Sequence, residues 1–413
     1  MKLPRLRAIT LLVLSVACGK DPVGPPPRIT ALPRALTTQE TRLIEADNRF
    51  AIKLLKQATA DTRDTLPNLF VSPLSVAMAL GMTYNGAAGT TEEAMRATLE
   101  LDGMTLAEVN EANQSLIALL RGLDPRVQFQ IANSIWYRNG FAVEQPFIDA
   151  NRTYFDARVD SLDFTSAAAP VTINNWVSDQ TKGLIEEIVE SPLPDEALMY
   201  LINAIYFKGD WTRQFDQQLT APRPFHLQSG STVNVPTMTF GHEVDVLVGA
   251  TAAGTVIDLP YGGAAFSMTI LLPHEQVGLD SALALLTLDA WQSGISTLDT
   301  VRRQVYLPKF KLENSLTLVP TLSGLGMGIA FTDAADFTRM YRPGGILITD
   351  VRHRTYVDVN EEGTTAAAVT AVVVGPTSSP PVVSVDRPFI FALRENLSGT
   401  ILFMGVIRHP TIE

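Results

Sequence analysis

The sequence predicts an α+β domain, and three observations carry this prediction. Helical patterns occupy the first half of the chain and strand patterns the second half, without the alternation of a βαβ fold. Hydrophobic residues make up 46% of the 413 residues and charged residues 18%, which is enough apolar material for a large core. Residues 37–413 contain no internal repeat and no second linker, so we expect one large domain there.

The first 17 residues have the composition of an export signal. Three basic residues precede a mostly apolar run from Ala8 to Ala17, which is too short for a bilayer span of about 20 residues. Cys18, the single cysteine, follows directly, and residues 14–18 resemble a bacterial lipobox. We therefore expect an exported protein, either extracellular or anchored in the periplasm or outer membrane through a lipid on Cys18. Ordinary secretion with an unmodified Cys18 is the alternative.

Residues 18–36 are predicted to be a tether, because prolines at this density favour extended chain. A helix follows it, since Thr37 and Glu40 have the spacing of a capping box and apolar residues recur at helical spacing from Leu43 to Leu55. Further helical patterns cover residues 75–84, 91–100, 105–121 and 173–181. Strand patterns then cover residues 199–207, 255–259, 266–272, 304–307, 355–359 and 389–393.

Composition and motifs exclude several classes of function. The formal net charge is −11, whereas a nucleic-acid-binding protein needs a basic face. One cysteine excludes a disulfide framework and a cysteine-based zinc cluster. The five histidines show no metal-binding spacing and no Gly-x-Ser-x-Gly elbow is present, so the sequence predicts no enzyme, metal or cofactor. A hydrolase with a dispersed Ser–His–Asp triad stays open as a weaker alternative.

The most unusual segment covers residues 361–381. From Gly363 to Pro381 it contains no charged and no aromatic residue. Alternate positions from Thr364 to Val374 carry only Thr, Ala and Val, so the first half can form a compact strand. The second half contains the Gly and Pro residues typical of a loop. Considered alone, the segment favours a plain strand followed by a loop, although such an uncharged stretch is an aggregation hazard if it stays exposed.

Several motifs, in order along the chain, resemble those of the serpin family. They are residues 68–75 (NLFVSPLS), 133–137 (NSIWY), 203–211 (NAIYFKGDW), 307–310 (LPKF), 325–327 (LGM), 335–337 (ADF), 361–368 (EEGTTAAA), 385–391 (VDRPFIF) and 403–405 (FMG). The likeness runs from about residue 37 to residue 413. It implies a serpin fold, which is α+β with three β-sheets, about nine helices and an exposed reactive-centre loop.

The resemblance implies a protease inhibitor and not an enzyme. Inhibitory serpins are suicide inhibitors of serine proteases, and sometimes of cysteine proteases. The protease cleaves the loop and forms an acyl-enzyme, after which the N-terminal part of the loop inserts into the main sheet and distorts the protease. A carrier or binding protein with the same fold is the alternative. The residues that match the hinge of the loop are Glu361, Gly363, Thr364, Thr365, Ala366, Ala367 and Ala368.

The family's usual loop length, counted back from Phe389, implies a reactive bond at Thr377–Ser378, within one to three residues. Residues 357–386 contain no Lys, Arg or aromatic side chain. This composition disfavours trypsin-like and chymotrypsin-like targets and favours an elastase-like or subtilisin-like serine protease as the partner. We expect a monomer that binds no nucleic acid and meets a membrane only through a lipid on Cys18.

The resemblance also implies two structural clusters around the gap that the loop enters. The shutter, a hydrogen-bonded cluster beneath the gap, corresponds to Ser72, Ser75, Asn203 and His353. The breach, at the top of the gap, corresponds to Trp211, Lys309 and Glu361, and an ion pair between Lys309 and Glu361 is expected to hold the loop-out state. For His353 alone, the charged neighbours Arg352 and Arg354 would instead favour a position on the surface of a strand.

Overall fold

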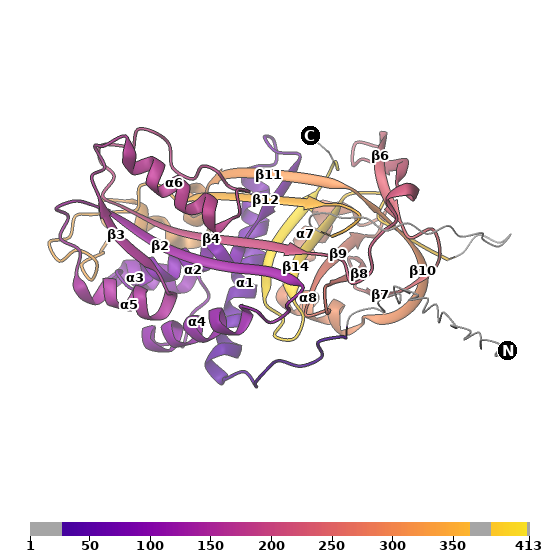
Figure 1. Cartoon of the computed structure of the whole chain (residues 1–413), viewed down its shortest axis with the longest axis horizontal. Helices are drawn as coiled ribbons and strands as arrows, with labels where there is room; N and C mark the ends of the chain where they lie inside the picture. The colour runs from indigo at the N-terminus through magenta and orange to yellow at the C-terminus, as the bar shows by residue number, and fades with distance from the viewer. Residues whose placement is uncertain (1–26, 364–380, 411–413) are drawn as a thin grey trace, which may run out of the picture.

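The computed structural model describes residues 27–363 and 381–410 (Figure 1). Nine α-helices lie in these ranges, and most of them come early in the chain. They are α1 (Thr38–Asp61), α2 (Pro73–Tyr84), α3 (Gly89–Thr98), α4 (Leu106–Leu120), α5 (Gln145–Phe155), α6 (Ala168–Gln180), α7 (Gly278–Leu285), α8 (Leu288–Ser296) and α9 (Val319–Leu322). Shorter helical turns cover Gln217–Leu219, Ser323–Met327 and Gly328–Phe331.

Side-chain caps determine where two important helices begin. The predicted capping box is present at α1: Thr37 Oγ1 accepts from the backbone N–H of Glu40 at 3.1 Å, and Glu40 Oε2 accepts from that of Thr37 at 2.7 Å. At α2, Ser72 Oγ accepts from the N–H of Ser75 at 3.3 Å, and Pro73 occupies the first turn, where no N–H is needed. This cap fixes Ser72 and Ser75 together at one end of α2.

Fifteen strands in the described ranges form three hydrogen-bonded groups. The largest has the order β1 (Asn68–Val71), β15 (Ile401–Ile407), β14 (Phe389–Glu395), β9 (Phe266–Pro273), β8 (Gly254–Tyr261), β7 (Val244–Ala250), β10 (Asp299–Pro308), β6 (Thr232–Thr239) and β5 (Ala221–His226), with β13 (Val382–Ser384) paired to β10. The second is β3 (Arg158–Leu162), β2 (Val127–Arg138) and β4 (Met199–Gly209), and the third is β11 (Phe310–Thr317) and β12 (Arg352–Val359).

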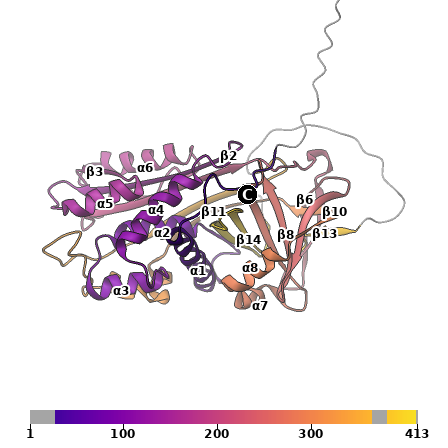
Figure 2. The same cartoon turned by 90° about the horizontal axis from the view of Figure 1, so that it is seen from below.

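The second and third groups lie side by side and make one layer that is interrupted between β4 and β12 (Figure 1). Among the described strands, no ladder joins β4 to β12, although Asp210, just after β4, bridges to Gly363, just after β12. Figure 2 shows α6 on one face of this layer and α1, α2 and α4 on the other. The unpaired strand edges are therefore covered from both faces.

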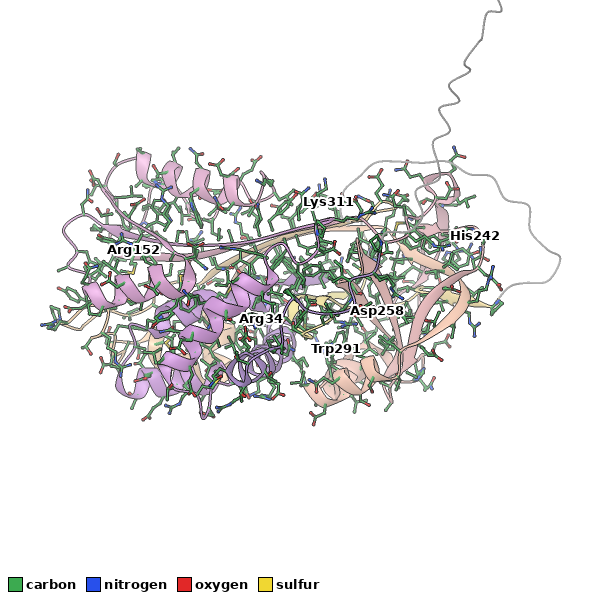
Figure 3. The ribbon with its side chains drawn as sticks, turned by 60° about the horizontal axis from the view of Figure 1, so that its bottom comes forward. Arg34, Arg152, His242, Asp258, Trp291 and Lys311 are labelled. Atoms are coloured by element: carbon green, nitrogen blue, oxygen red, sulfur yellow. The ribbon has the colours of Figure 1, made fainter. Side chains whose placement is uncertain are left out.

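The two faces of the layer pack against different partners. On one face, Trp136 of β2 meets Trp176 of α6 edge to face, with ring centroids 6.2 Å apart. On the other face, Phe207 of β4 contacts Phe266 of the large group at 5.8 Å. A buried ion pair between Asp258, labelled in Figure 3, and Arg394 joins β8 to β14 inside the large group. The layer thus packs against α6 on one face and against the large strand group on the other.

The predicted α+β fold with three sheets and about nine helices is confirmed. The interrupted layer is one sheet, and the large group bends into two at β10, whose first half pairs with β7 and whose second half pairs with β6 and β13. Within the described ranges, every helix and strand predicted from a pattern is present, with ends shifted by five residues or fewer, whereas the strand predicted in the first half of residues 361–381 lies outside them. The sequence patterns did not indicate the helices α5, α7, α8 and α9 or the strands β1, β2, β3, β5, β6, β7, β11, β13 and β15.

Candidate functional site

The chain leaves β12 through a tight turn that ends at Gly363. The N–H of Asn360 donates to the carbonyl of Gly363 at 3.0 Å, and Gly363 also forms an antiparallel bridge with Asp210. Its φ of +146° favours glycine, and a Cβ atom at this position would lie 2.1 Å from the carbonyl oxygen of Gly209. Glycine is therefore required where the chain passes between the ends of β4 and β12.

The three predicted breach residues lie around this turn. Lys309 Nζ is 2.9 Å from Glu361 Oε2, so the expected ion pair is present, and Thr220 Oγ1 donates to the other carboxylate oxygen at 2.7 Å. Burial alone would raise the pKa of Glu361, but the hydrogen bonds from Lys309 and Thr220 outweigh it and hold the pKa below its usual range. Trp211 Nε1 donates to the carbonyl of Asn360 at 2.8 Å. The turn is therefore held by both backbone and side-chain contacts.

Glu362 is a further charged residue in this turn, and the sequence did not single it out. Its side chain is buried, Gln217 Nε2 donates to its Oε1 at 3.1 Å, and its Oε2 has no hydrogen-bond partner among the described residues. Burial and the nearby carboxylates of Asp210 and Glu361 raise the pKa of Glu362. In this turn the ionised form of Glu361 is therefore stabilised, whereas the ionised form of Glu362 is destabilised.

The four predicted shutter residues lie together beneath the gap. His353 Nε2 accepts from the backbone N–H of Ser72 at 2.9 Å, and Ser72 Oγ donates to the carbonyl of Leu402 at 2.8 Å. Ser75 Oγ donates to the carbonyl of Asn203 at 3.4 Å. His353 is 6% exposed, so it lies in the interior and not on the surface of β12. Burial lowers its pKa to about 4, which keeps the imidazole neutral and able to accept at Nε2.

Asn133 joins this cluster, and sequence reasoning missed its role. Asn203 Nδ2 donates to Asn133 Oδ1 at 2.7 Å and thereby ties β4 to β2. The Oδ1 atom of Asn203 is buried and has no partner among the described residues. Asn133 does lie in the NSIWY motif, but nothing in the sequence indicated its contact with Asn203. A buried acceptor of this kind at the gap can take a hydrogen bond from an incoming donor.

A cavity of about 540 Å³ occupies the interruption between β4 and β12. Ser72 and residues of α2 such as Ser75 line one wall, and residues after α6 line another. Asn203 and His353 line its two sides. Because no described strand pairs with the edges of β4 and β12 that face this space, the cavity has the shape and the hydrogen-bonding groups to accept one more strand.

The described chain resumes at residue 381, and β13 follows directly. Val382 to Ser384 pair in parallel with Gln304 to Tyr306 of β10. His242 lies at the end of the molecule that carries β6 and β10, and Arg152 lies near the opposite end (Figure 3). The remaining predicted site residues lie outside the described residues: Thr364, Thr365, Ala366, Ala367, Ala368, Thr377, Ser378 and Cys18.

The described residues contain neither a cluster of metal-binding side chains nor a helix that could span a membrane. Among these residues, no three His, Cys, Asp or Glu side chains gather in a way that could hold a metal ion. Within the same ranges, every helix is too short or too polar to cross a membrane. The candidate site is thus the cavity with its turn and its shutter cluster.

Comparisons with known proteins agree with this geometry. A family model described as Serpin (serine protease inhibitor) matches residues 45–410. Iripin-8 of Ixodes ricinus is 34% identical over 388 residues, which cover 90% of this chain and 94% of that protein. The leukocyte elastase inhibitor of Bos taurus is 34% identical over 386 residues, which cover 89% of this chain and 100% of that protein.

Solved structures share the whole architecture. The thermophilic serpin Tengpin in its native state superposes with a TM-score of 0.81 at 28% identity, covering 92% of this chain and 96% of that one. Thyroxine-binding globulin in complex with thyroxine superposes with a TM-score of 0.80 at 27% identity, covering 90% and 100%. The family match, the curated relatives and the fold all lead to one assignment, and this chain belongs to the serpin family.

Proposed function

We propose that this chain is an exported suicide inhibitor of serine endopeptidases. The serine of the target protease attacks the carbonyl carbon of the reactive bond, proposed at Thr377–Ser378, and forms an ester while the amine of the next residue leaves. The freed N-terminal arm of the loop then enters the cavity between β4 and β12 as a new strand. Movement of the attached protease distorts its active site before water can hydrolyse the ester.

The observation that carries this proposal is that the pairing register extended along β4 and the pairing register extended along β12 agree for an inserted strand. On one side, extending the antiparallel bridge Asp210–Gly363 along β4 pairs Thr370 with Asn203. On the other side, extending the turn closed by the Asn360–Gly363 hydrogen bond along β12 pairs Thr370 with His353. Asn203 and His353 line opposite sides of the cavity. One inserted strand would therefore match both edges at once.

The same register explains the composition of the hinge. Thr364, Ala366 and Ala368 would pair with alternate residues of β12 from Val359 to Thr355, which are buried on the inner face. Small uncharged side chains meet no obstacle there. Thr370 would bring a hydroxyl donor beside Asn203 Oδ1, the acceptor that has no partner among the described residues. The inserted strand would thus complete the shutter cluster.

The energy available from insertion is sufficient to act on a protease. A strand of about ten residues gains ladder hydrogen bonds worth roughly 1 kcal/mol net each, together with the burial of valine methyl groups. This sum rivals the whole stability of a typical domain, about 5–15 kcal/mol. Insertion can therefore deform the attached enzyme.

The proposed target is an elastase-like or subtilisin-like serine protease, with a cysteine protease as a further class. Residues 357–386 offer such enzymes small and β-branched side chains and offer no basic or aromatic side chain. A curated relative named leukocyte elastase inhibitor supports this choice. In this proposal residues 1–17 direct export, and residues 18–36 tether the inhibitor through a lipid on Cys18. Residues 37–413 form the inhibitor domain, and the protein is a monomer.

The test is incubation of the purified protein with pancreatic elastase or subtilisin. An inhibitor of this kind forms an adduct that survives boiling in detergent, and mass spectrometry of the adduct locates the cut. Cleavage by every such protease without any adduct contradicts the proposal. Steady turnover of ester or peptide substrates by the protein itself would point to a hydrolase instead.

A carrier function is the second candidate, because thyroxine-binding globulin in complex with thyroxine shares the fold at a TM-score of 0.80. The two candidates differ in what loop cleavage does to stability. A large rise in melting temperature after cleavage means that the loop inserts and supports the inhibitor. An unchanged melting temperature favours the carrier.

A further inference from the structure

The first described residues of the chain form a strap that runs from the turn between β8 and β9 to α1 (Figure 1). We call residues 27–37 the strap. Near its start, the backbone N–H of Ile29 donates to the carbonyl of Gly263 at 2.7 Å, and a Cβ atom added to Gly263 would lie 3.1 Å from Ile29 Cδ1. Farther along, Arg34 Nη1 donates to the buried carboxylate of Glu40 at 2.8 Å. The strap therefore fixes the point on the surface at which the preceding residues join the domain.

The start of the strap lies beside the base of the reactive loop. Gly262, next to the residue that binds Ile29, donates its N–H to the carbonyl of Asp210 at 2.8 Å. Asp210 in turn forms the antiparallel bridge with Gly363, the last described residue before the loop. A short series of backbone contacts thus connects the strap to the loop, although the two segments lie at opposite ends of the sequence.

Three arginines surround the turn between β8 and β9, and we call them the arginine patch. Arg28 belongs to the strap. The Cβ atom of Arg126 lies 3.1 Å from a Cβ built on Gly262. Arg213 follows Thr212, whose Oγ1 donates to the carbonyl of Gly262 at 2.9 Å. All three arginines are exposed, and the ion pairs of the described residues include none of them.

Two carboxylates lie near the patch and do not cancel its charge. Asp124 is buried, and its carboxylate accepts from the backbone N–H of Gly263 at 2.7 Å and from that of Arg126 at 3.0 Å. Asp210 is exposed, but its charge acts on Glu362, whose pKa it helps to raise. The exposed groups around the turn therefore carry an excess of positive charge.

The rest of the chain is acidic. The formal net charge is −11, and loss of residues 1–17, which contain three basic and no acidic residues, leaves about −14. An anionic lipid surface repels such a molecule over most of its faces and attracts it only through a face with an excess of cations. The arginine patch is a face of this kind, and it lies where the proposed tether joins the domain.

The proposed tether is short compared with the domain. Residues 19–28 separate Cys18 from Ile29 and reach at most about 35 Å when fully extended. A domain of this length is roughly 50 Å across. With a lipid on Cys18 in the membrane, the strap and the arginine patch stay within reach of the headgroups. The opposite end of the molecule, which carries α3 and α5 in Figure 1, cannot take their place.

We infer that the arginine patch is a docking surface for anionic phospholipid headgroups, which acts together with a lipid on Cys18 and holds the base of the reactive loop toward the membrane. This inference rests on the lipid of the proposed function. An acyl chain and a basic patch are the two signals that together give stable membrane binding. Each arginine near an anionic surface strengthens binding about fivefold, so the three together are a substantial second signal.

The first experiment measures which arginines the membrane protects. The mature chain is coupled through Cys18, its single cysteine, to a maleimide lipid in vesicles of phosphatidylcholine, with or without phosphatidylglycerol. This coupling stands in for the natural lipid, so docking is measured separately from lipidation. Phenylglyoxal then modifies exposed arginines, and mass spectrometry gives the rate at each one. The control set lies at the end with α3 and α5 and consists of Arg96, Arg152 and Arg342.

We expect the three patch arginines to react about threefold or more slowly on vesicles with phosphatidylglycerol at low salt, because headgroups cover them. The protection should disappear on pure phosphatidylcholine and at about 1 M salt, whereas the control set should react equally on all vesicles. No protection of the patch, or equal protection of both sets, overturns the inference. Protection by soluble polyphosphate but not by vesicles assigns the patch to a soluble polyanion and also overturns it.

The second experiment measures affinity. The mature chain carries a single fourteen-carbon chain on Cys18, since one such chain of about this length gives only marginal binding and leaves the contribution of the patch visible. The variant Arg28→Gln/Arg126→Gln/Arg213→Gln should bind vesicles with phosphatidylglycerol about tenfold or more weakly than the wild type. The matched control neutralises the same number of charges with Arg96→Gln/Arg152→Gln/Arg342→Gln and should bind nearly as the wild type does. Equal losses in the two variants would show that only net charge matters and overturn the patch.

These outcomes are separate from those of the proposed function, because neither experiment uses a protease. Protection of the patch without any protease adduct leaves the docking surface standing and removes the inhibitor. Adduct formation without protection leaves the inhibitor standing and removes the docking surface. Mass spectrometry of the exported protein completes the test, since a Cys18 that carries no lipid overturns the joint anchorage.

Discussion

His353 accepts a hydrogen bond at Nε2 from the backbone N–H of Ser72 over 2.9 Å, and this bond ties β12 to the start of α2 across 281 positions of sequence. The bond requires a neutral ring, because a protonated Nε2 has no lone pair to accept with. Burial supplies that condition by lowering the pKa of His353 to about 4. The shutter is consequently sensitive to acid.

The first prediction concerns the dependence of stability on pH at His353. The pKa is lowered from 6.5 in the unfolded chain to about 4 in the folded protein, so the unfolded state binds the proton first. The stability contributed by the neutral ring is complete above about pH 6.5 and is lost as the pH falls toward 4, by roughly 3 kcal/mol at most. His353→Gln should lose this acid sensitivity in urea titrations between pH 7 and 4. The exposed control His226→Gln should retain it.

Asp47 in α1 produces the opposite trend, which is the second prediction. Burial raises its pKa from 3.8 to about 7. Between those values the folded protein binds a proton that the unfolded chain does not, so this contribution to stability rises as the pH falls from 7 to 4. Asp47→Asn should raise the unfolding free energy at pH 8 by one to a few kcal/mol, as expected for removing an ionised buried carboxylate. The exposed Asp64→Asn control should change little, and an unchanged pH profile in Asp47→Asn would contradict the assignment.

The sequence predicted structural features that depend on residues close together in the chain, but it did not predict individual contacts between residues far apart in the chain. The capping box of Thr37 and Glu40 lies within one helical turn, so spacing alone predicted it. The Asn133–Asn203 hydrogen bond joins residues 70 positions apart, and which acceptor lies opposite which donor depends on how β2 pairs with β4. The family resemblance identified Ser72, Ser75, Asn203 and His353 as one cluster. It did not identify Asn133, because the contact of Asn133 with Asn203 arises only when β2 pairs with β4.

The third prediction concerns the backbone at Gly363. A methyl group there would lie 2.1 Å from the carbonyl oxygen of Gly209, so Gly363→Ala must break the bridge to Asp210. The N–H of Trp211, which donates to the carbonyl of Glu362 at 2.8 Å, should then lose protection from hydrogen exchange. Gly122→Ala is the matched control, because Gly122 also has a positive φ but has no atom within 4 Å of its added Cβ. Retained protection at Trp211 would show that the turn does not depend on Gly363.

The fourth prediction concerns the hydrogen bond that the shutter cluster would gain once the loop has inserted. If Thr370 donates to Asn203 Oδ1 after insertion, Thr370→Val should lower the stability of the cleaved protein by about 1–3 kcal/mol and leave the intact protein unchanged, because an acceptor is left buried without a donor. Thr365→Val removes the same hydroxyl at an outward position and serves as the control. Calorimetry before and after cleavage within residues 375–380 makes the comparison. Equal losses in the two variants would argue against the proposed register.

The last prediction tests insertion itself at the first inward position of the hinge. In the proposed register Thr364 pairs with Val359 of β12 and with Gly209 of β4, and both of these residues are buried. Thr364→Arg would have to bury an unpaired guanidinium there, at a cost of several kcal/mol, so insertion stalls and water hydrolyses the acyl-enzyme first. The variant should be cleaved by elastase or subtilisin as a substrate, with few or no adducts. Thr365→Arg places the same charge on the outward face and should still form adducts. If Thr364→Arg inhibits as well as Thr365→Arg does, the protease is not trapped by a strand entering between β4 and β12.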